Sequence, residues 1–211
     1  MKILSLEIIL ILAALHARGQ GTLIYDQQSS IEAVPGEGYA ILQVATPLGQ
    51  SFTPSLGSVG FVRLQFFDWN NNNGQGAAVY VNLRSNSVTG PVLAASVPVF
   101  MPDGFGVAGG GFTNFLFPSP VSVTPGVTYF LEIPPQSGDV WALRGTVVPT
   151  PYAGGTEYIG GNPVNGDLWF QEGVVVPEPQ SSALLLLGIG LFFYARHFQT
   201  RKKRERKLFA H

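Results

Sequence analysis

The chain has 211 residues and combines 26 glycines and 16 prolines with only 12% charged residues. That composition suits a β-protein with many turns better than a helical one, and the length fits one domain plus two end segments. The sequence contains no cysteine, which excludes disulfide bonds.

The charges are segregated along the chain. Seven of the 12 basic residues lie between Arg196 and Lys207, whereas residues 20–177 hold three arginines against ten acids, a net charge of −7. An acidic middle segment argues against nucleic-acid binding, which needs a basic face. This segment also lacks His, Cys and Lys, which excludes a Ser-His-Asp or Cys-His nucleophile and a His-ligated zinc site. We therefore expect a protein that is not an enzyme.

Residues 1–19 are typical of a secretory signal peptide. Lys2 precedes a largely apolar run from Ile3 to Leu15, and small residues such as Ala17 and Gly19 follow. The run is too short for a stable membrane span, which needs about 20 residues. The alternative is a helix packed on a domain, but no polar stripe separates one face from another.

Residues 20–172 alternate apolar and polar side chains with period two. In 77–84, 126–133 and 61–67, for example, every second side chain is apolar, as in half-buried strands. Gly- and Pro-containing breakers separate such segments. The pattern predicts an all-β fold, an antiparallel two-sheet sandwich or jelly roll, flanked by an N-terminal signal helix and a C-terminal transmembrane helix. Further strands are expected at 21–27, 39–45, 49–54, 92–100, 112–117, 140–144 and 167–172.

The polar stretch after the strand at 61–67 is a candidate calcium loop. Asp68, Asn70 and Asn72 supply oxygen atoms at alternate positions. The stretch is not an EF-hand loop, because Gly74 comes one position late and Val79 stands where a bidentate Glu is needed. A polar hairpin loop is the simpler interpretation. With calcium, the domain would be a lectin-like, carbohydrate-binding module.

Aromatic residues offer a second kind of binding site. Trp69 and Tyr152 lie near predicted loops, where an exposed ring can stack on the apolar face of a sugar. Trp141 and Trp169 lie within strand patterns and are expected in the core.

A glycoside hydrolase, which needs a pair of carboxylates, is another alternative. Most acids of residues 20–172, such as Asp103 and Asp139, stand beside Gly and are interpreted as turn formers.

The C-terminal region divides into three parts. Residues 173–180 form a linker, residues 181–196 are apolar and near the lower limit for a membrane helix, and residues 197–211 form a basic tail. Basic residues stay on the cytoplasmic side, which places the acidic domain outside the cytoplasm. The alternative is a buried C-terminal helix. The orienting residues are Arg196, Arg201, Lys202, Lys203, Arg204, Arg206 and Lys207.

The order of these parts resembles the PEP-CTERM sorting signal of diderm bacteria. Val176, Pro177, Glu178 and Pro179 carry the motif, and the apolar helix and basic cluster follow it. The resemblance implies retention in the inner membrane, cleavage by an exosortase-type membrane protease, and a final place at the cell surface or in an exopolysaccharide matrix. Short pieces of the middle segment also resemble sandwich modules found with such tails, namely 50–54, 81–84, 124–129, 136–139 and 167–170.

Overall fold

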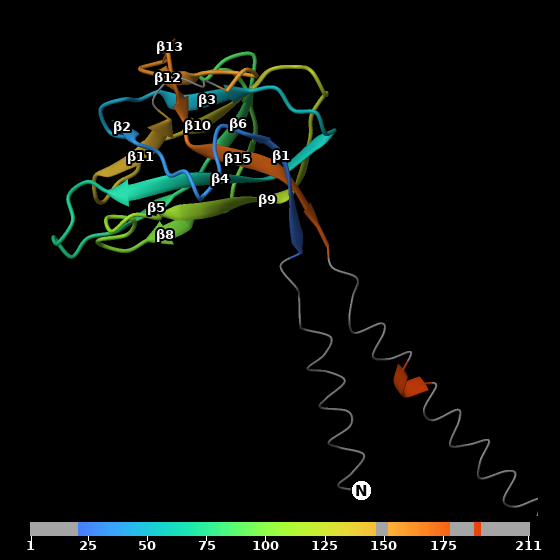
Figure 1. Ribbon diagram of the computed structural model, residues 1–211, viewed down its shortest axis with the longest axis horizontal. Coiled ribbons are helices and arrows are strands. Elements are labelled where there is room, and N and C mark those ends of the chain that lie inside the picture. Colours follow the sequence, from blue (N-terminus) through green and yellow to red (C-terminus); the bar gives the residue numbers. More distant parts are fainter. Residues whose placement is uncertain (1–20, 147–151, 178–187, 191–211) are drawn as a thin grey trace, which may run out of the picture. The chain divides into compact units, whose positions relative to one another are not determined.

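A computed structural model of the chain describes residues 21–146, 152–177 and 188–190. Residues 23–175 form one compact unit, in which every described strand pairing is antiparallel (Figure 1). The predicted all-β, antiparallel fold is therefore confirmed. The predicted signal segment 1–19, the basic tail 197–211 and most of the predicted membrane helix 181–196 lie outside the described residues.

Two sheets and a short ribbon make up the domain. The larger sheet contains β1 (Thr22–Gln28), β15 (Phe170–Val176), β4 (Ser58–Asp68), β9 (Phe112–Ser122), β11 (Trp141–Thr146), β2 (Gly38–Ile41) and β14 (Asp167–Leu168). The second sheet has the order β13 (Asn162–Pro163), β12 (Glu157–Ile159), β3 (Leu48–Phe52), β10 (Tyr129–Ile133), β6 (Asn82–Ser85) and β7 (Val92–Ala95). The ribbon pairs β5 (Ala77–Val79) with β8 (Val99–Met101).

The long strand β4 organises the larger sheet. One edge of β4 pairs with β9, and the other edge pairs first with β15 and then, at its end, with β11. Val62, Leu64 and Phe66 are fully buried, as their positions predicted, but Phe61 and Gln65 on the other face are buried as well. Burial of each apolar side chain contributes about 1.5–3 kcal/mol to folding.

The two sheets face one another across a shared apolar core, as in a β-sandwich. Phe52 of β3 and Phe170 of β15 lie across this core, with ring centroids 6.5 Å apart. Trp141 and Trp169 are fully buried, as expected from their strand patterns. The core is therefore continuous between the sheets and fixes the strands whose ends carry the candidate sites.

Three predicted strands are each divided in the structure. Residues 77–84 form β5 and β6, residues 92–100 form β7 and most of β8, and residues 167–172 form β14 and the start of β15. The first two divisions have one cause, because β5 and β8 pair in the ribbon whereas β6 and β7 pair in the second sheet. In the third, β14 pairs with β11 and β15 pairs with β4. Period-two alternation continues through such a change of partner strand, so it does not reveal the break.

Candidate functional site

The sorting segment begins where the last strand of the larger sheet ends. Val176 is the final residue of β15 and is 42% exposed, and Pro177 follows it outside the strand. Proline provides no N–H for a sheet ladder, which is consistent with the strand ending here. Glu178, Pro179 and the seven predicted orienting basic residues lie outside the described part of the chain. Residues 188–190 are helical, and among the described residues no helix has the length and apolar character needed to cross a membrane.

An aromatic patch lies on the outer face of the larger sheet. We define it by Tyr39 of β2, Phe67 of β4 and Trp69, which follows β4 directly. Tyr39 and Trp69 are 53% and 42% exposed, and their ring centroids are 4.8 Å apart. The guanidinium carbon of Arg144 lies 4.2 Å from the centre of the Phe67 ring. The patch therefore offers exposed rings beside a cation.

Strand alternation brings these side chains together. Phe67 and Trp69 flank Asp68, which points to the opposite face and is buried, and Tyr39 pairs with Arg144 in the β2–β11 ladder. Trp69 was predicted as a stacking residue, whereas Tyr39, Phe67 and Arg144 were missed. Their outward positions in alternating strands were the available signal, but alternation does not say which strands are neighbours.

Tyr152, the second predicted stacking residue, is placed elsewhere and is partly buried against the core. Its ring meets Phe170 edge-on at 5.2 Å, its hydroxyl donates to Gln27 Oε1 at 2.8 Å, and the same hydroxyl accepts from the Thr53 amide at 3.3 Å. Burial raises the pKa of this hydroxyl. Because ring and hydroxyl are both engaged within the domain, Trp69 alone remains of the two predicted stacking residues.

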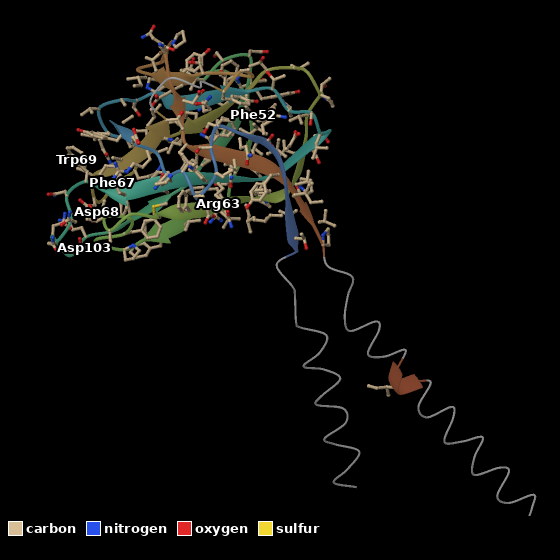
Figure 2. The ribbon with its side chains drawn as sticks, viewed as in Figure 1. Phe52, Arg63, Phe67, Asp68, Trp69 and Asp103 are labelled. Atoms are coloured by element: carbon tan, nitrogen blue, oxygen red, sulfur yellow. The ribbon has the colours of Figure 1, made fainter. Side chains whose placement is uncertain are left out.

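Three aspartates that are distant in the sequence converge at the end of β4, where Asp68 is the last residue of the strand. Asp68, Asp103 and Asp139 each place a carboxylate oxygen within 4.8 Å of the other two. We call this group the aspartate cluster. Asp68 and Asp103 are labelled in Figure 2, where they lie at the same end of the domain as Phe67 and Trp69. Two unit charges about 4 Å apart repel by about 4 kcal/mol near a protein surface, so the arrangement is costly without a compensating charge.

Backbone pairing explains why these loops meet. Asp68 N donates to Phe105 O at 2.9 Å, which attaches the turn that carries Asp103. Trp69 N donates to Val140 O at 3.0 Å, which attaches the loop that carries Asp139. Gly104 and Gly138 have φ of +78° and +116°, and a Cβ on Gly138 would lie 2.7 Å from Gly76 O. The loop that precedes β11 therefore requires glycine beside Asp139.

Main-chain amides already bind most oxygens of Asp68 and Asp103. Asp68 accepts from Asn70 N at 2.9 Å and Gly104 N at 2.8 Å, and Asp103 accepts from Asn72 N at 2.8 Å and Gly74 N at 2.9 Å. The Gly74 amide is the main cause of the lowered pKa of Asp103. Burial raises the pKa of Asp68, and the charge of Asp139 adds to this effect against the opposing amide bonds. The amides thus favour the ionised form of Asp103, whereas burial favours the protonated form of Asp68 beside it.

Asn70 and Asn72, the other predicted calcium ligands, enter this arrangement through their backbone amides, which bind Asp68 and Asp103. The structure brings Asp68 together with Asp103 and Asp139, two residues that the sequence interpretation treated as turn formers. Proximity to glycine was a correct signal for a turn, but a side chain in a turn can also point across to another loop. Asp68, Asp103 and Asp139 follow one another at intervals of about 35 residues in the sequence, so no short metal-binding motif identifies them.

A second group of acids lies inside the sandwich. Asp167 is fully buried, and its carboxylate accepts from Gln50 Nε2 at 2.8 Å and from Tyr152 N at 2.7 Å. Burial, with the nearby charge of Asp167, raises the pKa of Glu157 to about 7. Such a pair has the pKa of a general acid at neutral pH. Both side chains are buried, however, and the carboxylate oxygens of Asp167 are held by hydrogen bonds within the domain.

The buried Glu172 forms another pair with Asp26, which is only partly buried. Burial, together with the charge of Asp26, raises the pKa of Glu172 to about 8, and neither Glu172 oxygen has a hydrogen-bond partner among the described residues. Burial also acts on Asp26, but hydrogen bonds from the Ser55 hydroxyl and the Leu56 and Ser55 amides outweigh it, and the pKa of Asp26 is lowered. Glu172 thus favours the protonated form and Asp26 the ionised form because, among the described residues, hydrogen-bond donors surround Asp26 but not Glu172.

The fold and these surfaces define an all-β domain that ends in a sorting segment, and comparison with known proteins identifies that segment. Residues 175–202 match the PEP-CTERM protein-sorting motif. The chain therefore carries this motif, as its tripartite C-terminal region predicted, and the motif implies an exported protein that is processed by an exosortase. No curated protein matches the chain.

Proposed function

We propose that the protein is a non-catalytic component of the cell surface or extracellular matrix. Its C-terminal segment holds it in the inner membrane after export, until an exosortase-type protease cuts near Pro177, Glu178 and Pro179. The PEP-CTERM match at residues 175–202 carries this proposal. The charge distribution supports it, because an acidic domain and a basic end favour opposite sides of a membrane.

Mass spectrometry of the protein from a host that produces an exosortase tests this part. We expect the mature wild-type protein to lack residues 1–19 and the basic tail. The triple variant Pro177→Ala, Glu178→Ala, Pro179→Ala should keep the tail and stay in the membrane fraction, whereas Gln180→Ala, beside the motif, should mature normally. A wild-type surface protein that still ends at His211 would contradict the proposal.

The aromatic patch supports a role in polysaccharide binding. Sugar rings have apolar faces that stack on exposed aromatic rings, and Tyr39 and Trp69 present such rings 4.8 Å apart on the outer face of the sheet. Arg144 beside Phe67 adds a positive charge in a domain that is otherwise acidic, which favours a polymer with carboxylate groups.

Co-sedimentation of the mature protein with exopolysaccharide purified from the host tests this role. We expect Trp69→Ala to weaken binding about tenfold, since stacking on one aromatic ring contributes about 1 kcal/mol or more. Phe100→Ala is the matched control, because Phe100 of β8 is 68% exposed and lies outside the patch. Equal binding by wild type and Trp69→Ala would remove the patch from the proposed function.

A further inference from the structure

The aspartate cluster brings together three acids that are remote in the sequence, and the described structure pairs none of them with a basic side chain. The described ion pairs join Arg63 to Glu32 and Arg84 to Glu132. The third arginine of the domain, Arg144, lies against the Phe67 ring. Among the described residues, the cluster therefore has no basic side chain to balance its negative charge.

The Asp139 side chain gives a second and independent indication that the cluster binds a ligand. Its side chain is only 3% exposed. Oδ1 accepts from Asn73 Nδ2 at 2.9 Å and from Val140 N at 2.8 Å, which uses both of its lone pairs. Oδ2 is buried and has no hydrogen-bond partner among the described residues. A buried carboxylate oxygen without a donor is costly, and its carboxylate belongs to the cluster, so a ligand for this oxygen is expected there.

The spacing of the oxygens fits a single ion. Oxygens on opposite sides of a calcium ion are about 4.6–5.2 Å apart, because each Ca–O distance is about 2.3–2.6 Å. The three carboxylate oxygens of the cluster lie within 4.8 Å of one another, inside that span. The amide bonds to Asp68 and Asp103 leave each bound oxygen one lone pair, so these carboxylates can also bind a metal.

We propose that Asp68, Asp103 and Asp139 bind one calcium ion. The donors are all oxygens, which hard cations prefer, and the cluster contains no His or Cys ligand that would favour zinc. The end of a strand supplies Asp68 and two loops supply Asp103 and Asp139. Calcium tolerates such irregular geometry better than magnesium, which requires a near-ideal octahedron. The site differs from the Asp68, Asn70, Asn72 loop expected from sequence, and it does not depend on the sorting proposal.

The ion would add a further connection among three segments that hydrogen bonds already join. These are the end of β4, the turn after β8 and the loop before β11. Trp69 follows Asp68 directly, so calcium would also fix the edge of the aromatic patch. Calcium is abundant outside the cytoplasm, where the sorting motif implies that the domain acts.

Thermal unfolding of the full-length protein in detergent, treated with chelator and then titrated with CaCl₂, tests the site. Tryptophan fluorescence reports both binding near Trp69 and unfolding. We expect a rise in Tm of about 5–10 °C at a calcium concentration about 100 times the Kd. Asp139→Asn should remove this rise. The variant should still fold, because its Oδ1 can keep both donors and its amide removes one uncompensated charge.

Asp26→Asn is the matched control, since Asp26 also binds backbone amides but lies outside the cluster. This variant should keep the full calcium response. Three results would overturn the proposal: no rise in Tm for wild type, an equal rise for Asp139→Asn, or an equal rise when MgCl₂ replaces CaCl₂. The Tm of metal-free Asp139→Asn, expected at or above that of metal-free wild type, distinguishes loss of a ligand from loss of the fold.

Discussion

The domain contains two acid-rich regions that differ in how their charge is balanced. In the aspartate cluster, backbone amides and one asparagine side chain donate to the carboxylates. The Gly74 amide lowers the pKa of Asp103, whereas burial raises the pKa of Asp68. Among the interior acids, Glu157 and Glu172 are buried with raised pKa values of about 7 and about 8. We propose a cation as the partner of the first region, whereas the second takes up protons. The same residue types therefore serve different purposes according to the donors around them.

The largest effect is expected for Asp167→Ala. This change leaves Gln50 Nε2 and the Tyr152 amide without their acceptor in the interior, at a cost of about 1–3 kcal/mol for each group. We expect urea unfolding to show a loss of about 2–4 kcal/mol. Asp167→Asn keeps one oxygen acceptor and should lose about half as much. A loss below about 0.5 kcal/mol for Asp167→Ala would show that the interior acids do not contribute to stability.

Glu172→Gln tests the proton side of the comparison. Below the unfolded pKa of 4.5 both states of wild type carry the proton, and between 4.5 and about 8 only the folded state keeps it. Stability of wild type therefore falls as the pH rises through this window. We expect the variant to match wild type near pH 4.5 and to become progressively more stable than wild type as the pH rises to about 8, as measured by urea unfolding. The same pH dependence in both proteins would contradict the raised pKa of Glu172.

The sequence predicted the β-architecture because alternation and Gly/Pro breakers depend on each segment alone. It predicted the sorting motif for the same reason, since Val176, Pro177, Glu178 and Pro179 are contiguous. It did not predict the aspartate cluster or the aromatic patch. Asp68 meets Asp103 and Asp139 only because β4 ends between β11 and the turn after β8, and no local pattern specifies which strands become neighbours.

The position of β15 limits how the protein can be trimmed. This strand lies between β1 and β4 in the larger sheet, although it is the last strand before the sorting motif. The larger sheet is complete only when β15, which ends at Val176, has inserted between β1 and β4. In an exported chain, this strand is among the last parts of the domain to cross the membrane. A cut upstream of that residue would shorten an inner strand and expose the ladders of both neighbours. The segment that begins at Pro177 is therefore the first position after the domain where a protease can remove the C-terminal segment without disrupting the larger sheet.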